Sequence, residues 1–255
     1  MNKSVIQLRT LVQREILRYV RRPWNTFLPP FITNVLYFSV FGVILGSRIG
    51  ETLGYSYIQF VFPGLIVLGA ISNAFENASF SIFHGRWNEY IEAVLTSPIS
   101  YRSTVAAYVL SSSLRGFLIG ILIFIVGLIF TTVPLAHPLY FLAFMLIITT
   151  LFAGFGVIGG LWAKDFDYLT VLNQFILRPL VFFGGVFYSL EILPNTWRTI
   201  SLLNPMVYMV NGIRYGMLGI AEVDPNFSLA ILTVGTISVL GIDLLLFKRG
   251  YGLVD

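Results

Sequence analysis

Charge is scarce in this chain, and cysteine is missing altogether. Asp, Glu, Lys and Arg make up 11% of the 255 residues, whereas a soluble domain carries about 25% because it needs charge to cover its surface. Hydrophobic residues account for 56% of the chain, aromatic residues for 16%, and the mean hydropathy is +0.83. Length alone would allow one or two soluble domains, but this composition indicates a surface that faces mostly lipid.

Residues that carry out catalysis are equally scarce. The absence of cysteine excludes disulfides, thiolate catalysis and cysteine metal sites. The two histidines, His84 and His137, are predicted on opposite sides of the membrane, which excludes a histidine-based metal or triad site within the chain. No G-x-x-x-x-G-K-[ST] phosphate-binding loop occurs. We therefore predict a protein that is not an enzyme and binds no metal or cofactor itself.

The hydrophobic runs predict an all-α, polytopic membrane protein with six transmembrane helices. Each run is close to the ~20 residues that cross a hydrocarbon core of ~30 Å. The whole chain, 1–255, is predicted to form a single transmembrane domain, with its sixth span inside 227–247. The predicted spans cover 25–45, 60–83, 105–130, 139–162, 171–190 and 229–247.

Residues 1–24 are predicted to form a basic amphipathic helix. Apolar residues recur there at spacings of three and four, with six Lys and Arg residues between them, a pattern typical of a helix in the interface of an anionic leaflet. Membrane lipids are therefore expected partners. Eleven Lys and Arg residues fall on one predicted side and three on the other, which places both termini, including the tail 248–255, in the cytoplasm. The net charge of +4 follows from this bias and does not indicate nucleic acid.

The segment 191–226 is too apolar for a polar loop and too interrupted for one continuous helix. Pro194, the pair at 204–205 and Gly212 would each break a helix. We predict two short helices that dip partway into the outer leaflet, with a seventh full span as the alternative. The candidate gate residues of this segment are Pro194, Trp197, Asn204 and Pro205.

The loop between spans 2 and 3 is predicted to contain a short amphipathic helix within 85–98. Its apolar residues are Trp87, Ile91, Val94 and Leu95. Such a helix either rests on its own protein or docks into a groove of a soluble partner, and the sequence leaves both open. The candidate docking residues are Arg86, Trp87, Glu89, Ile91, Glu92, Leu95 and Pro98, the last of which is predicted to end the helix.

Four ionisable residues fall inside predicted spans, where an isolated charge is costly. Two acids and two bases make ion pairs between helices plausible, and a polar lining for a cavity open to the cytoplasm is the second possibility. Polar residues of span 2 extend the same set. The candidates are Asn73, Glu76, Asn77, Arg115, Arg178 and Asp243. The G-x-G-x-x-G match at 154–159 lacks a preceding strand, and Gly156 and Gly160 instead predict close helix packing.

The order of these features resembles the membrane permeases of ABC-2 type transporters, in particular small permeases of bacterial inner membranes. The resemblance spans nearly the whole chain. It rests on the stretch Glu92-x-x-Leu95-x-Ser97-Pro98, and on the motifs at 46–50, 62–64, 184–189, 204–208 and 214–216. It implies two copies of this chain with two copies of a separate ABC ATPase subunit that holds ATP and Mg²⁺.

The resemblance further implies export by alternating access. Spans 1, 2 and 5 would line the pathway, the helix within 85–98 would couple to the ATPase, and 191–210 would cap the pathway from outside. An amphipathic, lipid-like or glycan substrate fits the aromatic spans. Two alternatives remain: an ion-coupled secondary transporter that works alone, and a membrane anchor for a cytoplasmic enzyme.

Overall fold

The computed structural model describes residues 3–253, so two residues of each predicted terminal segment, 1–24 and 248–255, lie outside it. The described chain is all-α apart from one short hairpin. In chain order the elements are α1 (Lys3–Val20), α2 (Pro23–Phe38), the π-helical η1 (Ser39–Leu45), α3 (Gly46–Ile49), β1 (Glu51–Thr52), β2 (Tyr55–Ser56), α4 (Tyr57–Trp87), α5 (Tyr90–Leu95), α6 (Tyr101–Phe130), α7 (Pro138–Trp162), α8 (Phe166–Val171), the π-helical η2 (Leu172–Leu177), α9 (Arg178–Val181), the π-helical η3 (Phe182–Val186), the 3-10 turn η4 (Leu190–Ile192), α10 (Asn195–Ser201), α11 (Pro205–Leu218) and α12 (Pro225–Arg249).

Five helical segments of the described chain are long and apolar enough to cross a membrane. They correspond to predicted spans 1, 2, 3, 4 and 6. Polar caps set where several of them begin: Ser56 and Gln59 form a capping box at α4, and Ser100 and Asp224 accept backbone hydrogen bonds at the starts of α6 and α12. The five segments are Pro23–Ile49, Tyr57–Trp87, Tyr101–Phe130, Pro138–Trp162 and Pro225–Arg249.

The predicted fifth span, 171–190, is not among these five. Helical turns run from Phe166 to Val186 as α8, η2, α9 and η3, and then stop. Pro179 has no N–H for the helical ladder and crowds the preceding turn, so the widened π turns lie on both sides of it. Gly185 adopts a left-handed conformation with φ 76°, which glycine tolerates best, and this ends the helical path.

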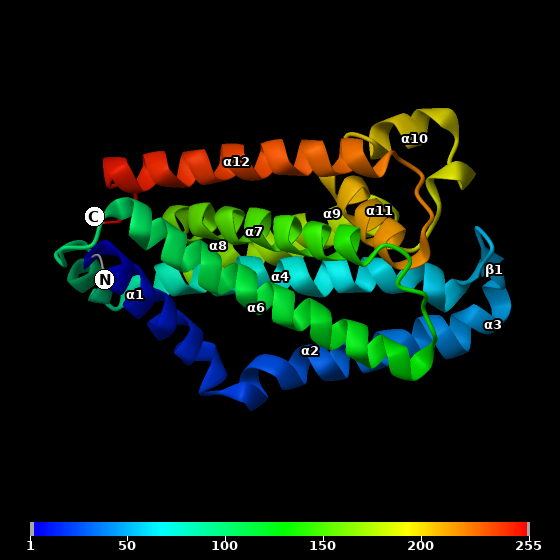
Figure 1. Cartoon of the computed structure of the whole chain (residues 1–255), viewed down its shortest axis with the longest axis horizontal. Helices are drawn as coiled ribbons and strands as arrows, with labels where there is room; N and C mark the ends of the chain where they lie inside the picture. Colours follow the sequence, from blue (N-terminus) through cyan, green and yellow to red (C-terminus); the bar gives the residue numbers. More distant parts are fainter. Residues whose placement is uncertain (1–2, 254–255) are drawn as a thin grey trace.

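Helix α4 is the central element of the bundle. It is largely buried, whereas the first and last of the five segments are largely exposed, and Figure 1 shows α2 and α12 on opposite sides of it. Its closest neighbours are α6 and α7, which approach through glycine. A Cβ atom added at Gly156 would lie 2.5 Å from the carbonyl oxygen of Phe75, and one at Gly160 would lie 2.6 Å from that of Ser79. The predicted packing role of these two glycines is confirmed.

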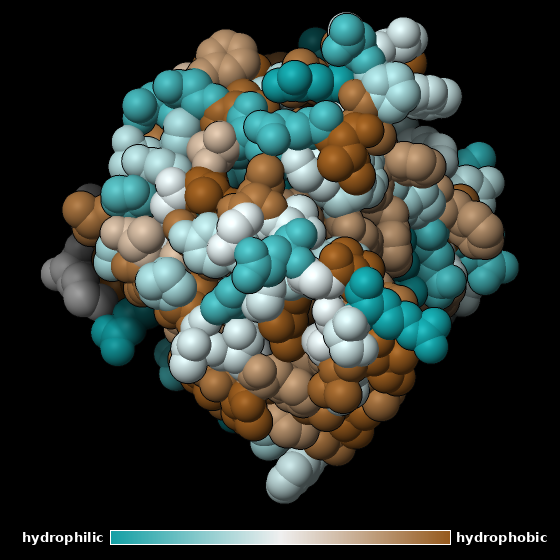
Figure 2. Space-filling view, turned by 90° about the vertical axis from the view of Figure 1, so that its right-hand side faces the viewer, coloured by the Kyte–Doolittle hydropathy of each residue, from teal (hydrophilic) through white to brown (hydrophobic). Residues whose placement is uncertain are grey.

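The two ends of the bundle differ in content. Helix α1 begins and α12 ends at one end, where α5 also lies (Figure 1); we call this the α5 end. The hairpin β1–β2, α3 and α10 form the other, which we call the hairpin end. Figure 2 views the hairpin end and shows a largely hydrophobic lower flank, on the side where α2 and η1 carry the exposed residues Val40, Val43 and Ile44.

The predicted helix within 85–98 is divided in two. Helix α4 continues through Arg86 and Trp87, Glu89 takes up a left-handed conformation with φ 60°, and α5 then covers only six residues. The helix also ends before Pro98, because the residue preceding a proline disfavours the helical conformation. The predicted apolar face is split accordingly: Ile91 and Val94 are buried, and Trp87 and Leu95 are exposed.

Candidate functional site

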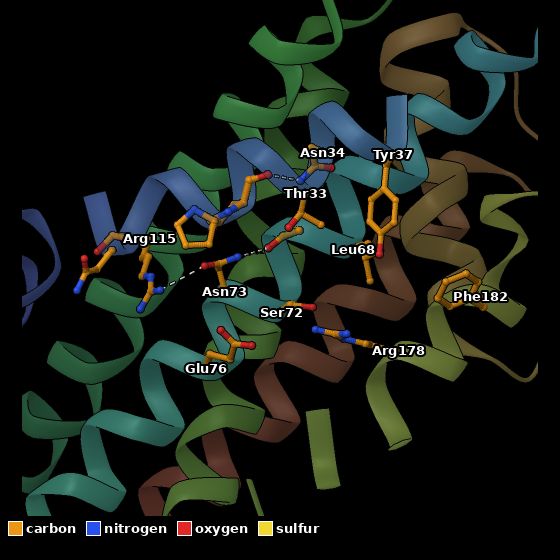
Figure 3. A pocket seen from close by; sticks show the side chains of 15 residues that line it. Thr33, Asn34, Tyr37, Leu68, Ser72, Asn73, Glu76, Arg115, Arg178 and Phe182 are labelled. Carbon is orange, nitrogen blue, oxygen red and sulfur yellow. Dashed lines mark hydrogen bonds between the residues drawn. The ribbon is translucent and has the colours of Figure 1, made fainter. Parts of the chain in front are cut away.

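A polar cavity of about 260 Å³ lies between α2, α4, α6 and the segment α9–η3 (Figure 3). It takes in most of the intramembrane residues that the sequence singled out: Asn73, Glu76, Arg115 and Arg178. Asn77 adjoins it through its hydrogen bond with Arg115. The remaining lining residues are Asn25, Thr26, Pro29, Pro30, Thr33, Asn34, Tyr37, Leu68, Gly69, Ser72 and Phe182.

Arg115 is held by amide oxygens and not by a carboxylate. Its Nη1 donates to Asn77 Oδ1 at 3.2 Å, and its Nη2 donates to Asn73 Oδ1 at 3.3 Å. Asn77 is fixed in turn, because its Nδ2 donates to Ser112 Oγ at 2.8 Å and its Oδ1 also accepts from Arg18 Nη2 at 3.0 Å. This arrangement links α1, α4 and α6 at one point and keeps a charged guanidinium solvated inside the bundle.

Glu76 faces the same cavity and also bonds to an amide. Asn173 Nδ2 donates to Glu76 Oε1, which ties η2 to the central helix α4. Within residues 3–253 the structure shows no salt bridge among Glu76, Arg115, Arg178 and Asp243. The four charges are therefore not paired in the way that ion-pair glue would require, and three of them line the same cavity of about 260 Å³.

Asp243 lies apart from the cavity. It is on α12, fully buried against α7, where a Cβ atom added at Gly154 would come within 3.1 Å of its Oδ2. Neither carboxyl oxygen has a hydrogen-bond partner within the described chain. Of the six intramembrane candidates, this is the one that the fold does not bring near the others.

At the α5 end, a second cavity of about 380 Å³ separates α5 from the end of α7. Five of the predicted docking residues line it together with Lys164, and of these Glu92 is exposed. Leu95 and Pro98 lie outside it and are exposed. The lining residues are Phe83, Arg86, Trp87, Glu89, Ile91, Glu92, Ala163, Lys164 and Leu253.

The guanidinium of Arg86 is engaged within the chain. Its Nη1 donates to the carbonyl oxygens of Gly160, Leu161 and Ala163, at 3.0, 2.9 and 2.9 Å. These carbonyls lie at the C-terminus of α7, where the helix has no further N–H groups to donate to them and where a cation is favourable. Arg86 thus fastens the loop-side end of α4 to α7 and so supports α5.

At the opposite end, sequence reasoning missed a buried ion pair. Arg214 on α11 and Glu222 just after it lie 3.0 Å apart, with side-chain exposures of 2% and 4%. Arg214 Nη2 also donates to the carbonyl oxygen of Gly185 at 2.7 Å, and its guanidinium lies 3.9 Å from the centre of the Phe60 ring. Glu222 accepts from Ser189 Oγ. The pair therefore fixes the point where the η3 helical path ends.

The predicted gate residues occupy the same end. Asn204 caps α11, with its Oδ1 accepting from Met206 N at 3.0 Å, and its Nδ2 reaches back to the carbonyl oxygen of Leu180 at 2.7 Å. Pro205 begins α11, and Pro194 precedes α10. Trp197 is 61% exposed on α10. Two short helices are present where the sequence predicted them.

A family model described as ABC-2 type transporter matches residues 6–218 of the chain, which include α5, the residues that line the central cavity, and Arg214. The chain belongs to the ABC-2 type transporter family. The resemblance inferred from the sequence motifs is thereby confirmed. ABC-2 permeases work with an ABC ATPase, which accounts for the missing phosphate-binding loop.

Relatives of this ABC-2 chain include two that are named as transport permeases. It is 40% identical over 249 residues to the inner membrane transport permease YadH of Escherichia coli strain K12, covering 97% of each chain. It is 27% identical over 212 residues to nodulation protein J of Rhizobium leguminosarum bv. viciae, covering 81% of this chain and 80% of the relative. A putative transport permease, ycf38 of Cyanophora paradoxa, is 26% identical over 219 residues, covering 82% and 73%.

Replacing Arg86 by Gln is expected to destabilise the ABC-2 chain without preventing assembly. The variant removes charge-assisted hydrogen bonds to three carbonyls, which contribute about 1.5–3 kcal/mol. Thermal unfolding of the purified protein in neutral detergent measures the loss, with Arg9→Gln, an exposed site on α1, as the control. A variant as stable as the control, but defective in binding a partner, would show that Arg86 acts in docking instead.

Proposed function

We propose that this chain is the membrane-spanning subunit of an exporter driven by ATP hydrolysis on a separate ABC ATPase. The observation that carries the proposal is the polar cavity of Glu76, Arg115 and Arg178 inside a chain of the ABC-2 family that has no nucleotide-binding loop. Ionisable residues that face the interior of a membrane bundle or a water-filled cavity mark substrate pathways. The cargo is an amphipathic, lipid-like or glycan molecule.

In this proposal the chain crosses the bacterial inner membrane six times. The 21 residues from Phe166 to Val186 span about 31 Å at 1.5 Å per residue, enough for a sixth crossing of a ~30 Å core. The distribution of Lys and Arg puts the α5 end and both termini in the cytoplasm. The inner membrane follows by analogy with YadH.

The working unit is two copies of this chain with two ATPase subunits. Helix α5 and the cavity beside it at Arg86, Trp87, Glu89 and Glu92 receive the ATPase, which holds ATP and Mg²⁺. Closure of the ATPase pair would push on α5 and thereby on α4, the central helix. Segments α2, α4 and α8–η3 line the pathway, α10 and α11 cap it on the outer side, and α1 rests in the anionic leaflet.

Purification of the full chain from bacterial membranes tests this proposal. We expect a second polypeptide with a phosphate-binding loop to co-purify, and vesicles holding both chains to move amphiphiles only when ATP is supplied. Transport by the chain alone, driven by an ion gradient with no ATP, would instead establish the secondary-transporter alternative. Purification of the chain with an enzyme but without any transport would establish the anchor alternative.

A further inference from the structure

The central cavity carries an excess of positive charge. Among its lining residues one is acidic, Glu76, and two are basic, Arg115 and Arg178, while the others are neutral. Arg18, which bonds to Asn77 beside the cavity, already shares Glu15 with Arg14. The cavity therefore carries a net charge of +1, at a depth where a charge without a counter-charge is costly.

Arg178 is the source of this imbalance. Arg115 has two amide oxygens, and Glu76 has the amide of Asn173. Within residues 3–253 the side chain of Arg178 makes no hydrogen bond or salt bridge, and it is exposed. In Figure 3 its guanidinium extends from α9 toward Ser72 and Glu76, and so into the cavity.

A guanidinium in this position favours one kind of ligand group. Arginine presents planar, paired N–H donors that match carboxylate and phosphate oxygens, and these charge-assisted bonds are among the strong ones. A cationic group would be repelled by the positive charges of Arg178 and Arg115. An uncharged group would leave the excess positive charge of the cavity without a counter-charge.

The size of the cavity limits how much of a ligand it holds. At about 260 Å³ it is smaller than the ~300–1,000 Å³ of sites that enclose drug-sized molecules. Phe31 and Ile32 of α2, together with Phe182 and Phe183 of η3, are exposed apolar side chains on the elements that flank it. The cavity therefore suits a headgroup, and these elements suit an acyl chain that stays in the hydrocarbon.

We propose that Arg178 makes the permease selective for amphiphiles with an anionic headgroup, a phosphate or a carboxylate, bound in the central cavity with the tail left in lipid. This inference rests on the proposed transport function and narrows its substrate class. Arg178 is the specificity-determining residue, and Arg115 and Glu76 form the fixed polar wall opposite it.

Three amphiphiles with the same twelve-carbon tail test the proposal: dodecyl phosphate, dodecylphosphocholine and dodecyltrimethylammonium. Their Kd values are measured by calorimetry on the full chain, with its ATPase partner, in a neutral maltoside detergent. We expect dodecyl phosphate to bind about tenfold tighter than the other two. Inorganic phosphate alone should bind more weakly than dodecyl phosphate. Equal Kd values for the three amphiphiles would overturn the proposal. If inorganic phosphate binds as tightly as dodecyl phosphate, the ligand of the cavity is a soluble anion and not an amphiphile, which also overturns the proposal.

Charge variants separate selectivity from folding. Arg178→Gln should remove the preference, Arg178→Lys should keep part of it, and Arg178→Glu should invert it in favour of the cationic amphiphile. Inversion cannot come from misfolding. Arg198→Glu, at an exposed position on α10, is the matched control and should keep the wild-type order. An Arg178→Glu protein that still prefers dodecyl phosphate would overturn the proposal.

The two proposals fail differently in these experiments. If an ATPase co-purifies and amphiphiles of every charge stimulate it equally, the charge selectivity is wrong and the transport function stands. If anionic amphiphiles bind selectively but no ATPase co-purifies, the selectivity stands and the ATP-driven function is wrong.

Discussion

Replacement of Glu222 by Gln is expected to destabilise the protein by about 3–5 kcal/mol, the usual result when one partner of a buried ion pair is removed. The variant leaves Arg214 charged, 2% exposed and facing Phe60 without a carboxylate. It also weakens the bonds that Glu222 accepts from Ser189 and from the backbone N–H of Leu190. The measurement is thermal unfolding in neutral detergent, together with the yield of folded protein.

The second half of this experiment is the double variant. Arg214→Met together with Glu222→Gln removes both charges, so it should recover more than half of the lost stability, because a buried pair contributes little once its desolvation cost is removed as well. Glu191→Gln, at an exposed acid within η4, is the control and should change little. If Glu222→Gln loses no more stability than this control, the ion pair is not buried in the folded protein.

Reversing the charge of Glu92 is expected to uncouple the permease from its ATPase. Glu92 is exposed on α5 and borders the cavity at the α5 end, so Glu92→Arg would put a like charge against any basic partner surface. Such a mismatch costs several kcal/mol, which corresponds to a loss of affinity of about a hundredfold or more. The measurements are co-purification of the ATPase and its stimulated ATP hydrolysis in vesicles.

The control for Glu92 lies at the other end of the molecule. Glu51→Arg changes an exposed acid of the hairpin, and it should leave both readouts unchanged. Glu92→Arg should still insert into the membrane and unfold at the wild-type temperature, since the side chain makes no bond within the described chain that holds α5 in place. Normal complex formation and transport by Glu92→Arg would refute the docking role of α5.

The sequence alone was enough to predict most of the membrane-crossing helices. Apolar runs placed all five of the observed candidate spans to within four residues at each end, for example 139–162 against Pro138–Trp162. The observed helices extend further where polar caps such as Ser100 and Asp224 hold their first turns. Hydropathy does not detect such caps, so the predicted ends fell short.

Other features depend on contacts that no linear pattern reveals. The span predicted at 171–190 is segmented because Pro179 and Gly185 act within a run that is apolar on average. Arg214 was counted only as an outside charge, and Glu222, in the loop before α12, carried no signal of its own. The sequence leaves open whether the intramembrane charges pair with one another or line a cavity. In the structure Arg115 and Glu76 bond to amides instead, which only the relative rotation of packed helices decides.

Helix α4 is longer than a membrane is thick. Its 31 residues extend for about 46 Å, against a hydrocarbon core of about 30 Å, and the 30 residues of α6 are nearly as long. The polar ends of both helices, with Arg86 on α4 and Arg102 on α6, lie next to α5, so the excess length falls on that side. We therefore expect α5 to lie beyond the hydrocarbon core, at a distance from the lipid surface that changes with the thickness of the bilayer.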